Sequence, residues 1–190
     1  MSEPGLATAS LRRRLGLPGP YVMWCGTHEP RKNLATLLRA FELLVADGRD
    51  LDLLLVGPQG WGPQTAPAPS VAARVRTAGF LPTDELHAAY AGAAVLAYPS
   101  LREGFGMPVL EAMAHGVPVV TTRGSAMAEF ATGSGVLVDP VDPADVAAGV
   151  DAALRDAPAF SAAGRARAAG MTWATAADRL LAVYRRAAGA

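Results

Sequence analysis

Two glutamates with a glycine-rich spacer are the residues of this chain that most clearly could do chemistry. Glu103 and Glu111 flank the segment Gly-Phe-Gly-Met-Pro-Val-Leu. Pro108 followed by apolar residues is typical of a helix start, which places Glu103 and Gly106 in the loop before a helix. A helix start offers unpaired N–H groups, and the glycines let a ligand approach the backbone closely. The spacing therefore predicts an anion site, and phosphate is the anion that suits it best.

The two carboxylates narrow the kind of ligand. Carboxylates repel phosphate but accept hydrogen bonds from hydroxyl groups. A ligand that suits all of these groups carries phosphates in its middle and polyols at both ends, as a nucleoside diphosphate sugar does. Taken alone, Glu103 could be a solvated loop residue and Glu111 a favourable charge in the first turns of the helix. The prediction therefore depends on the two glutamates together.

A second loop carries two cations beside another helix start. Arg31 and Lys32 lie at the end of residues 26–33, between an apolar run and a helical pattern that Asn33 could cap. Two cations beside a helix start suit a diphosphate, because they donate charge-assisted hydrogen bonds to its oxygens. Lys32 is the only lysine of the chain. The alternative is a solvated pair of surface charges.

The elements that must position these loops follow from alternating apolar runs. Runs typical of buried strands occur at residues 21–26, 51–56, 74–81, 94–98, 117–121 and 135–138, with helical patterns between them. We expect Thr83 to cap one helix and Asp142 to begin another. The alternation predicts an α/β fold with a doubly wound parallel sheet. Ligands bind beyond the carboxyl ends of such strands, so the loops should converge on one cleft.

The glutamate motif with its flanks resembles a known signature. Tyr-Pro-Ser precedes Glu103, and Ala-Met-Ala-His-Gly-Val-Pro-Val-Val follows Glu111. The whole stretch is similar to the E-x7-E signature of retaining glycosyltransferases of the two-domain GT-B type, group 1 or family 4. Residues 26–33, Gly-Thr-His-Glu-Pro-Arg-Lys-Asn, resemble the phosphate-binding loop of that family. The resemblance covers residues 15–188.

The resemblance implies a role for each matched position. Arg31 and Lys32 would hold the diphosphate, and Glu111 the ribose diol. Glu103 and the amides after it would hold the donor sugar, so Glu103, Arg31 and Lys32 are the implied catalytic residues. The full implied donor site is Gly26, Thr27, Arg31, Lys32, Phe80, Leu81, Glu103, Gly104, Phe105, Gly106, Met107 and Glu111, with the backbone near Phe80 and Leu81 facing the base. The family's reaction retains the anomeric configuration and uses no metal or other cofactor.

The prolines and glycines of residues 1–20, together with the resemblance, divide the chain into three parts. Residues 1–20 are a lead-in segment, residues 21–170 a single Rossmann-like donor-binding domain, and residues 171–190 a terminal helix. The domain corresponds to the second half of a GT-B fold, so the acceptor-binding N-terminal domain is missing. In the family the terminal helix reaches toward that domain. We therefore expect its apolar face to be frayed, folded back or buried by self-association.

Composition and cysteine usage limit the setting of the protein. A net charge of +0 predicts no nucleic-acid partner, and hydrophobic residues at 51% suit a buried core. Cys25 is the only cysteine, which excludes an internal disulfide and favours a reduced compartment. No apolar run reaches membrane-spanning length. We expect a cytoplasmic protein, with peripheral membrane attachment kept open for a full-length version.

Several alternatives stay open at this point. The loop at residues 26–33 resembles that of mannosyltransferases, which implies GDP-mannose as the donor, with a UDP-hexose as the alternative. A non-catalytic sugar-nucleotide module is a rival to the enzyme. Asp50 and Asp52 form a D-x-D pair, but at the amino end of a strand, away from the cleft. His28 could touch the ligand, whereas His87 and His115 are expected to be structural. A dinucleotide oxidoreductase is disfavoured, because the first strand is not followed by G-x-G-x-x-G.

Overall fold

The computed structural model describes residues 4–62 and 65–189, and these form a parallel sheet covered by helices. The sheet has six strands in the order β3-β2-β1-β4-β5-β6, and every neighbouring pair is parallel. The strands are β1 (Tyr21–Cys25), β2 (Asp52–Val56), β3 (Val75–Gly79), β4 (Val95–Tyr98), β5 (Val119–Thr122) and β6 (Val136–Val138). The predicted doubly wound α/β fold is confirmed. Residues 1–3, 63–64 and 190 lie outside the described residues.

The central strands read as continuous apolar runs because both faces of the sheet are covered. Every residue of β2, β4 and β5 is buried, as are the first four residues of β1. Burial on both faces is what favours unbroken runs over alternation in parallel sheets. The register places Val22 beside Val95 and Met23 beside Leu96, so β1 and β4 are neighbours at the centre.

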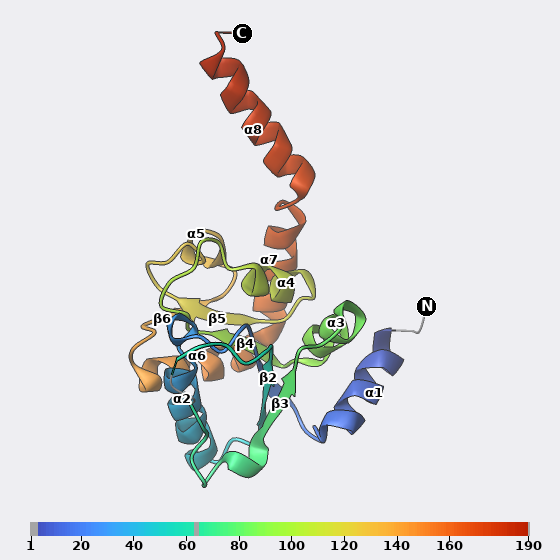
Figure 1. Ribbon diagram of the computed structural model, residues 1–190, viewed down its shortest axis with the longest axis vertical. Helices are drawn as coiled ribbons and strands as arrows, with labels where there is room; N and C mark the ends of the chain where they lie inside the picture. The colour runs from blue at the N-terminus through green and yellow to red at the C-terminus, as the bar shows by residue number, and fades with distance from the viewer. Residues whose placement is uncertain (1–3, 63–64, 190) are drawn as a thin grey trace.

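Helices cover both faces of the sheet (Figure 1). They are α1 (Pro4–Leu15), α2 (Leu34–Ala46), α3 (Thr83–Gly92), α4 (Met107–Ala114), α5 (Ala128–Ala131), α6 (Pro143–Arg155), α7 (Ala157–Ala169) and α8 (Trp173–Ala187), with short 3-10 turns at Pro30–Lys32 and Ala72–Arg74. α2 packs against α6, which contacts β4, β5 and β6; α4 contacts β4, β5 and α7. This layering is what right-handed β-α-β crossovers produce.

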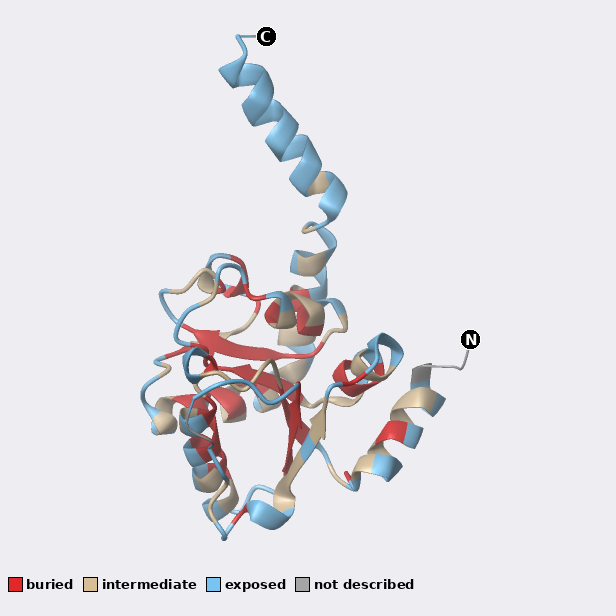
Figure 2. Ribbon diagram, viewed as in Figure 1, coloured by how far each residue is buried: buried red, intermediate tan, exposed pale blue. Residues whose placement is uncertain are grey.

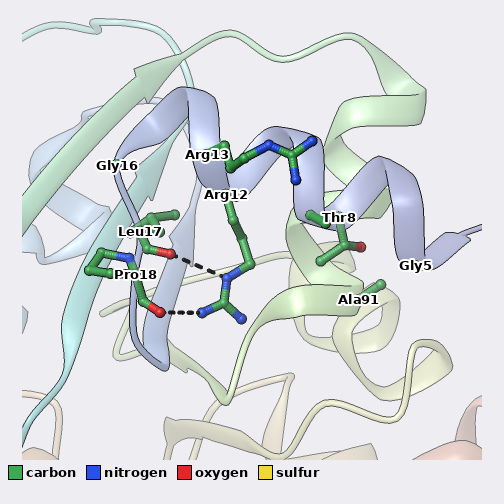
Figure 3. A pocket seen from close by; sticks show the side chains of 9 residues that line it. Gly5, Thr8, Arg12, Arg13, Gly16, Leu17, Pro18 and Ala91 are labelled. Atoms are coloured by element: carbon green, nitrogen blue, oxygen red, sulfur yellow. Dashed lines mark hydrogen bonds between the residues drawn. The ribbon is translucent and has the colours of Figure 1, made fainter.

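Residues 1–20, the predicted lead-in segment, contain a helix that the sequence analysis did not predict. α1 packs against α3, with Leu11 buried and the Thr8 hydroxyl donating to the carbonyl of Ala88 at 3.2 Å. A cleft of about 1070 Å³ is lined by α1, by residues 16–18 that follow it and by Ala91 of α3. Figure 3 shows Arg12 in this cleft, where its guanidinium donates to carbonyls of the segment that leads into β1. α1 is thereby fastened to the domain.

Two residues predicted to cap helices, Thr83 and Asn33, make no side-chain cap bond. Thr83 is the first residue of α3 rather than its cap; the cap position belongs to Pro82, and no side chain caps this helix. Asn33 does precede α2, but in a left-handed conformation with φ 57°, and its side chain makes no cap bond. Its amide donates instead to the carbonyls of Pro99 and Pro140. Asp142 does cap α6, accepting from the Ala144 amide at 2.8 Å.

The terminal helix α8 projects away from the domain and is exposed along its length (Figure 2). Its apolar side includes Trp173, whose residue is 87% exposed, with Leu180 and Tyr184 also exposed. The helix is continuous over the described residues, so the chain shows neither the fraying nor the folding back that was expected. Self-association through this face stays a prediction. Among the described residues, no helix has both the length and the apolarity to cross a membrane.

Candidate functional site

The candidate site lies where the strand order reverses. The chain passes outward from β1 to β2 and β3, then returns through α3 to β4 on the other side of β1. The loop after β1 (residues 26–33, the cation loop) and the loop after β4 (residues 99–106, the glutamate loop) therefore start side by side. Such a switch point at the carboxyl ends of the strands is where doubly wound sheets bind ligands.

Hydrogen bonds hold the two loops against each other. The carbonyl of Arg31 accepts from the Leu101 amide at 2.8 Å and from the Ser100 hydroxyl at 2.9 Å. The side-chain amide of Asn33 also donates, through Nδ2, to the Pro99 carbonyl at 3.0 Å. The left-handed conformation of Asn33, which asparagine tolerates better than most residues, is thus supported by long-range contacts. The cation loop and the glutamate loop form one rigid unit.

Arg31 and Lys32 both bind Glu103. The Lys32 ammonium donates to Glu103 Oε1 at 2.6 Å and also to the Tyr98 hydroxyl. Arg31 Nη1 donates to Glu103 Oε2 at 2.9 Å, while its Nε donates to Glu29 at 2.8 Å. Each oxygen of the Glu103 carboxylate therefore has a cation of its own. Sequence reasoning placed these residues in one cleft but did not predict that they pair.

Glu103 is held as a carboxylate by this environment. Its Oε1 also accepts from the hydroxyls of Tyr98 at 2.9 Å and Ser100 at 2.8 Å. Burial by itself would raise the pKa of Glu103, but the hydrogen bonds from Lys32, Ser100 and Tyr98 outweigh it and lower the pKa below its ordinary value. The side chain is therefore an ionised acceptor with a fixed orientation.

The two cations differ in how open they are to a ligand. The Lys32 side chain is 10% exposed, whereas that of Arg31 is 45% exposed. An ammonium has three N–H donors and a guanidinium has five. Among the described residues, Lys32 uses two of its donors and Arg31 Nη2 makes no hydrogen bond. Both cations can therefore meet an anion without releasing Glu103.

The start of α4 depends on a glycine. Gly106 precedes the helix with φ 101°, and its carbonyl accepts from the amide of Val109 at 3.0 Å. A Cβ at this position would stand 2.3 Å from Cγ of Met127. Only glycine satisfies both the left-handed backbone and this close approach. The predicted sugar-binding amides, those of residues 104–107, lie at this turn and end at Met107, the first residue of α4.

We expect Gly106→Ala to lower the free energy of unfolding by roughly 2–4 kcal/mol, since left-handed strain and overpacking add. Gly104→Ala is the matched control two residues away, because its Cβ would meet no atom within 4 Å; it should stay within about 0.5 kcal/mol of the parent. Urea denaturation of the three proteins measures both effects. Equal stabilities for the two variants would contradict the role of Gly106.

Glu111 lies on α4 and has a different partner. The Tyr90 hydroxyl, on α3, donates to Glu111 Oε2 at 2.8 Å. Among the described residues, no hydrogen bond or ion pair joins Glu111 to Arg31, Lys32 or Glu103. The two glutamates of the motif therefore belong to separate polar groups, one at the end of β4 and one along α4.

A family model described as glycosyl transferases group 1 matches residues 19–156, more than half of the chain. The chain belongs to the group 1 glycosyl transferases. It is 37% identical over 141 residues to O-antigen chain mannosyltransferase B of Escherichia coli, covering 72% of this chain and 37% of that protein. It is 36% identical over 201 residues to D-inositol 3-phosphate glycosyltransferase of Corynebacterium diphtheriae, covering 95% and 46%.

The structure of this group 1 glycosyl transferase also matches solved structures. Sucrose-phosphate synthase of Thermosynechococcus elongatus aligns with a TM-score of 0.74 and 28% identity, over 95% of this chain and 49% of that chain. The fold is the Rossmann-like half of the GT-B architecture, as predicted. The chain spans half or less of the length of these relatives.

The remaining predicted donor residues lie on the same edge of this glycosyl transferase domain. Gly26 donates its amide to the Val56 carbonyl at 2.9 Å and follows β1 directly, with Thr27 next in the cation loop. Phe80, just after β3, is 77% exposed, while Leu81 is buried. Phe105 stacks on Phe130 with ring centroids 5.1 Å apart. Their contacts with a ligand stay predictions.

The remaining candidates from the sequence are the D-x-D aspartate pair and the three histidines. Asp50 pairs with Arg74 at 2.8 Å, and Asp52 begins β2, so both lie at the amino end of that strand, as expected. His87 and His115 contact each other, Nδ1 to Nε2, at 2.9 Å. His28 lies edge-on to Trp24 with centroids 5.2 Å apart. In the described part of the chain, no group of three or more His, Cys, Asp or Glu could hold a metal ion.

Sequence reasoning missed three side chains of the site: Tyr98, Ser100 and Tyr90. Tyr98 and Ser100 stand in the Tyr-Pro-Ser flank of the motif, where the position after a buried strand was the available signal. No signal in the sequence indicated a role for Tyr90, because it lies among alanines on a helix, 21 residues before Glu111. Only the packing of α3 beside α4 brings them together.

Proposed function

We propose that this chain is the donor-nucleotide-binding half of a retaining glycosyltransferase that transfers a hexose from a nucleoside diphosphate sugar to an acceptor hydroxyl. The observation that carries the proposal is the pairing of Arg31 and Lys32 with Glu103 at the switch point of the sheet. GDP-mannose is the leading donor, supported by the identity to a mannosyltransferase. A UDP-hexose is the alternative.

The cations suit the diphosphate. In the transfer, the bond from the anomeric carbon to the phosphate oxygen breaks and the diphosphate leaves with the electron pair. Charge-assisted hydrogen bonds strengthen as that charge develops, so Arg31 and Lys32 stabilise the transition state more than the bound donor. The reaction is proposed to proceed without a metal or other cofactor.

Glu103 suits the donor sugar. Its carboxylate is ionised and fixed by four donors, three on Oε1 and one on Oε2. Oε2 therefore keeps a site that can accept from a sugar hydroxyl without reorganising. The amides at the start of α4 lie next in the chain, where Gly106 keeps the backbone open. Glu111, which lies on α4 beyond the glutamate loop, accepts hydrogen bonds from the ribose hydroxyls.

In this proposal, the other half of the reaction belongs to a second domain. The relatives are about twice as long as the aligned part. We propose that an N-terminal domain binds the acceptor and closes over the donor, and that α8 with its exposed apolar side meets that domain. A cytoplasmic setting, with peripheral membrane attachment of a longer protein, is part of the same proposal.

We expect two alanine variants to separate the roles of the glutamates. Glu111→Ala should weaken the binding of both the nucleotide and the nucleotide sugar, since ribose is common to them. Glu103→Ala should matter chiefly when the sugar is present. Calorimetry with GDP against GDP-mannose, and UDP against UDP-glucose, measures the four affinities and also identifies the base. Equal losses on both ligands for both variants would refute this division.

A non-catalytic sugar-nucleotide module is the second candidate, since the cations and carboxylates described above suit nucleotide binding without transfer. Both candidates predict nucleotide binding. They separate when a version that carries an N-terminal domain is assayed for sugar transfer, because only the enzyme gains turnover.

A further inference from the structure

We propose that Tyr90 is a positioning residue, which fixes the Glu111 carboxylate so that this domain selects ligands that carry ribose hydroxyls. The proposal rests on the proposed function, because it assumes that the domain binds a nucleoside diphosphate. It adds a residue from α3 to a site otherwise built from the loops after β1 and β4 and from α4.

The geometry fixes the Tyr90 hydroxyl. The residue is 1% exposed, and its ring stacks on the imidazole of His115 with centroids 5.7 Å apart and planes 16° from parallel. His115 in turn contacts His87 on α3 at 2.9 Å. A ring packed in this way keeps its hydroxyl in one place. That hydroxyl donates to Glu111 Oε2 at 2.8 Å.

The Tyr90 hydroxyl is a permanent donor. Burial, with smaller contributions from Cys25 and Glu111, raises the pKa of Tyr90 far above its ordinary value. The phenol therefore stays protonated at neutral pH. An ionised carboxylate only accepts, so the bond between them has one direction.

The bond leaves acceptor capacity on Glu111 for a ligand. A carboxylate has about four lone-pair sites on two oxygens. Among the described residues, the Tyr90 hydroxyl is the side-chain hydrogen-bond donor to Glu111, and it occupies one site on Oε2. Oε1 keeps its sites for the two ribose hydroxyls. A glutamate already held in place loses less rotamer freedom when a ligand binds.

Removal of the hydroxyl alone tests this role. We expect Tyr90→Phe to weaken the binding of GDP or UDP by roughly three- to tenfold, the range for immobilising one rotamer-rich side chain. The 2′,3′-dideoxy forms of the same nucleotides lack the hydroxyls that Glu111 accepts, so their affinity should not change. The preference for the ribose form over the dideoxy form should therefore fall by the same factor.

Two further variants separate positioning from folding. Tyr21→Phe is the matched control: Tyr21 is equally buried and its hydroxyl donates at 2.6 Å to Ala89, one residue from Tyr90, but has no contact with Glu111. It should keep the ribose preference of the parent. In a Glu111→Ala background, Tyr90→Phe should bring no further loss of preference, because the carboxylate it positions is gone.

The outcomes distinguish the two levels of the proposal. A fall in ribose preference for Tyr90→Phe, absent in Tyr21→Phe, supports the inference. Equal weakening of ribose and dideoxy forms, or no change, overturns it and leaves the proposed function standing. A parent chain that binds neither nucleoside diphosphate overturns both.

Discussion

Incubated with a labelled nucleotide sugar and an acceptor, this chain is expected to bind the donor and to complete no multiple turnovers. Binding is expected to need the two cations, the amides at the start of α4 and the Glu111 carboxylate that accepts from ribose. All of these lie between residues 26 and 111. Transfer needs an acceptor hydroxyl about 3 Å from the anomeric carbon, on the face from which the diphosphate departs, with water excluded. Those tasks require a second domain.

The expected difference is large. Proximity and orientation can contribute about 7–11 kcal/mol to a reaction, which corresponds to a rate factor of roughly 10⁵ to 10⁸. A version that carries an N-terminal acceptor domain should therefore exceed the isolated chain by several orders of magnitude. Donor hydrolysis should also be slow, because each oxygen of the Glu103 carboxylate already accepts a hydrogen bond from a cation, which makes it a weak base. Multiple turnovers by the isolated chain would refute the prediction.

Lys32→Ala is expected to weaken nucleoside diphosphate binding by roughly 1.5–3 kcal/mol, the range for a charged hydrogen bond. The substitution removes a buried ammonium that contacts both Tyr98 and Glu103. Arg31→Ala should have an effect in the same range. It should disturb the orientation of Glu103 less than Lys32→Ala does, because Arg31 is more exposed. Affinity for the plain nucleoside, which has no phosphate, should barely change in either variant.

Arg74→Ala is the matched control for these cation variants. Arg74 also pairs with a carboxylate at 2.8 Å and is 39% exposed, but it lies at the amino end of the strands, with Asp50. Its removal should leave diphosphate affinity within error of the parent. Calorimetry with nucleoside, diphosphate and nucleotide sugar measures all three variants. If Lys32→Ala and Arg31→Ala bind the diphosphate as the parent does, the cation loop is not the phosphate site.

The sheet and the position of its loops followed from local patterns. A strand buried on both faces must be apolar throughout, so β1, β2, β4 and β5 are visible as runs in the sequence. The strand at residues 74–81 was predicted two residues too long at its end, because Phe80 and Leu81 continue the apolar pattern after Gly79 turns with φ 68°. The motif around Glu103 and Glu111 indicated a ligand by residue type and spacing alone.

The helix α1 and the caps show where local patterns fail. Prolines and glycines made residues 1–20 read as a lead-in, yet the stretch between them forms a helix because α3 offers it a packing surface. Thr83 and Asn33 have the residue types of caps. Their actual roles depend on Pro82 in one case and on carbonyls more than sixty residues away in the other.

What the sequence determined by itself, then, is which residues are available and at which end of the sheet they lie. Only the tertiary structure decided which of them touch. Glu103 meets Arg31 and Lys32 because β4 lies beside β1 in the sheet, across more than seventy positions of chain. Tyr90 meets Glu111 because α3 and α4 pack together. Hydrogen-bonded partners of buried polar groups are set by strand order and helix packing, which are global properties of the chain, and no local pattern contains them.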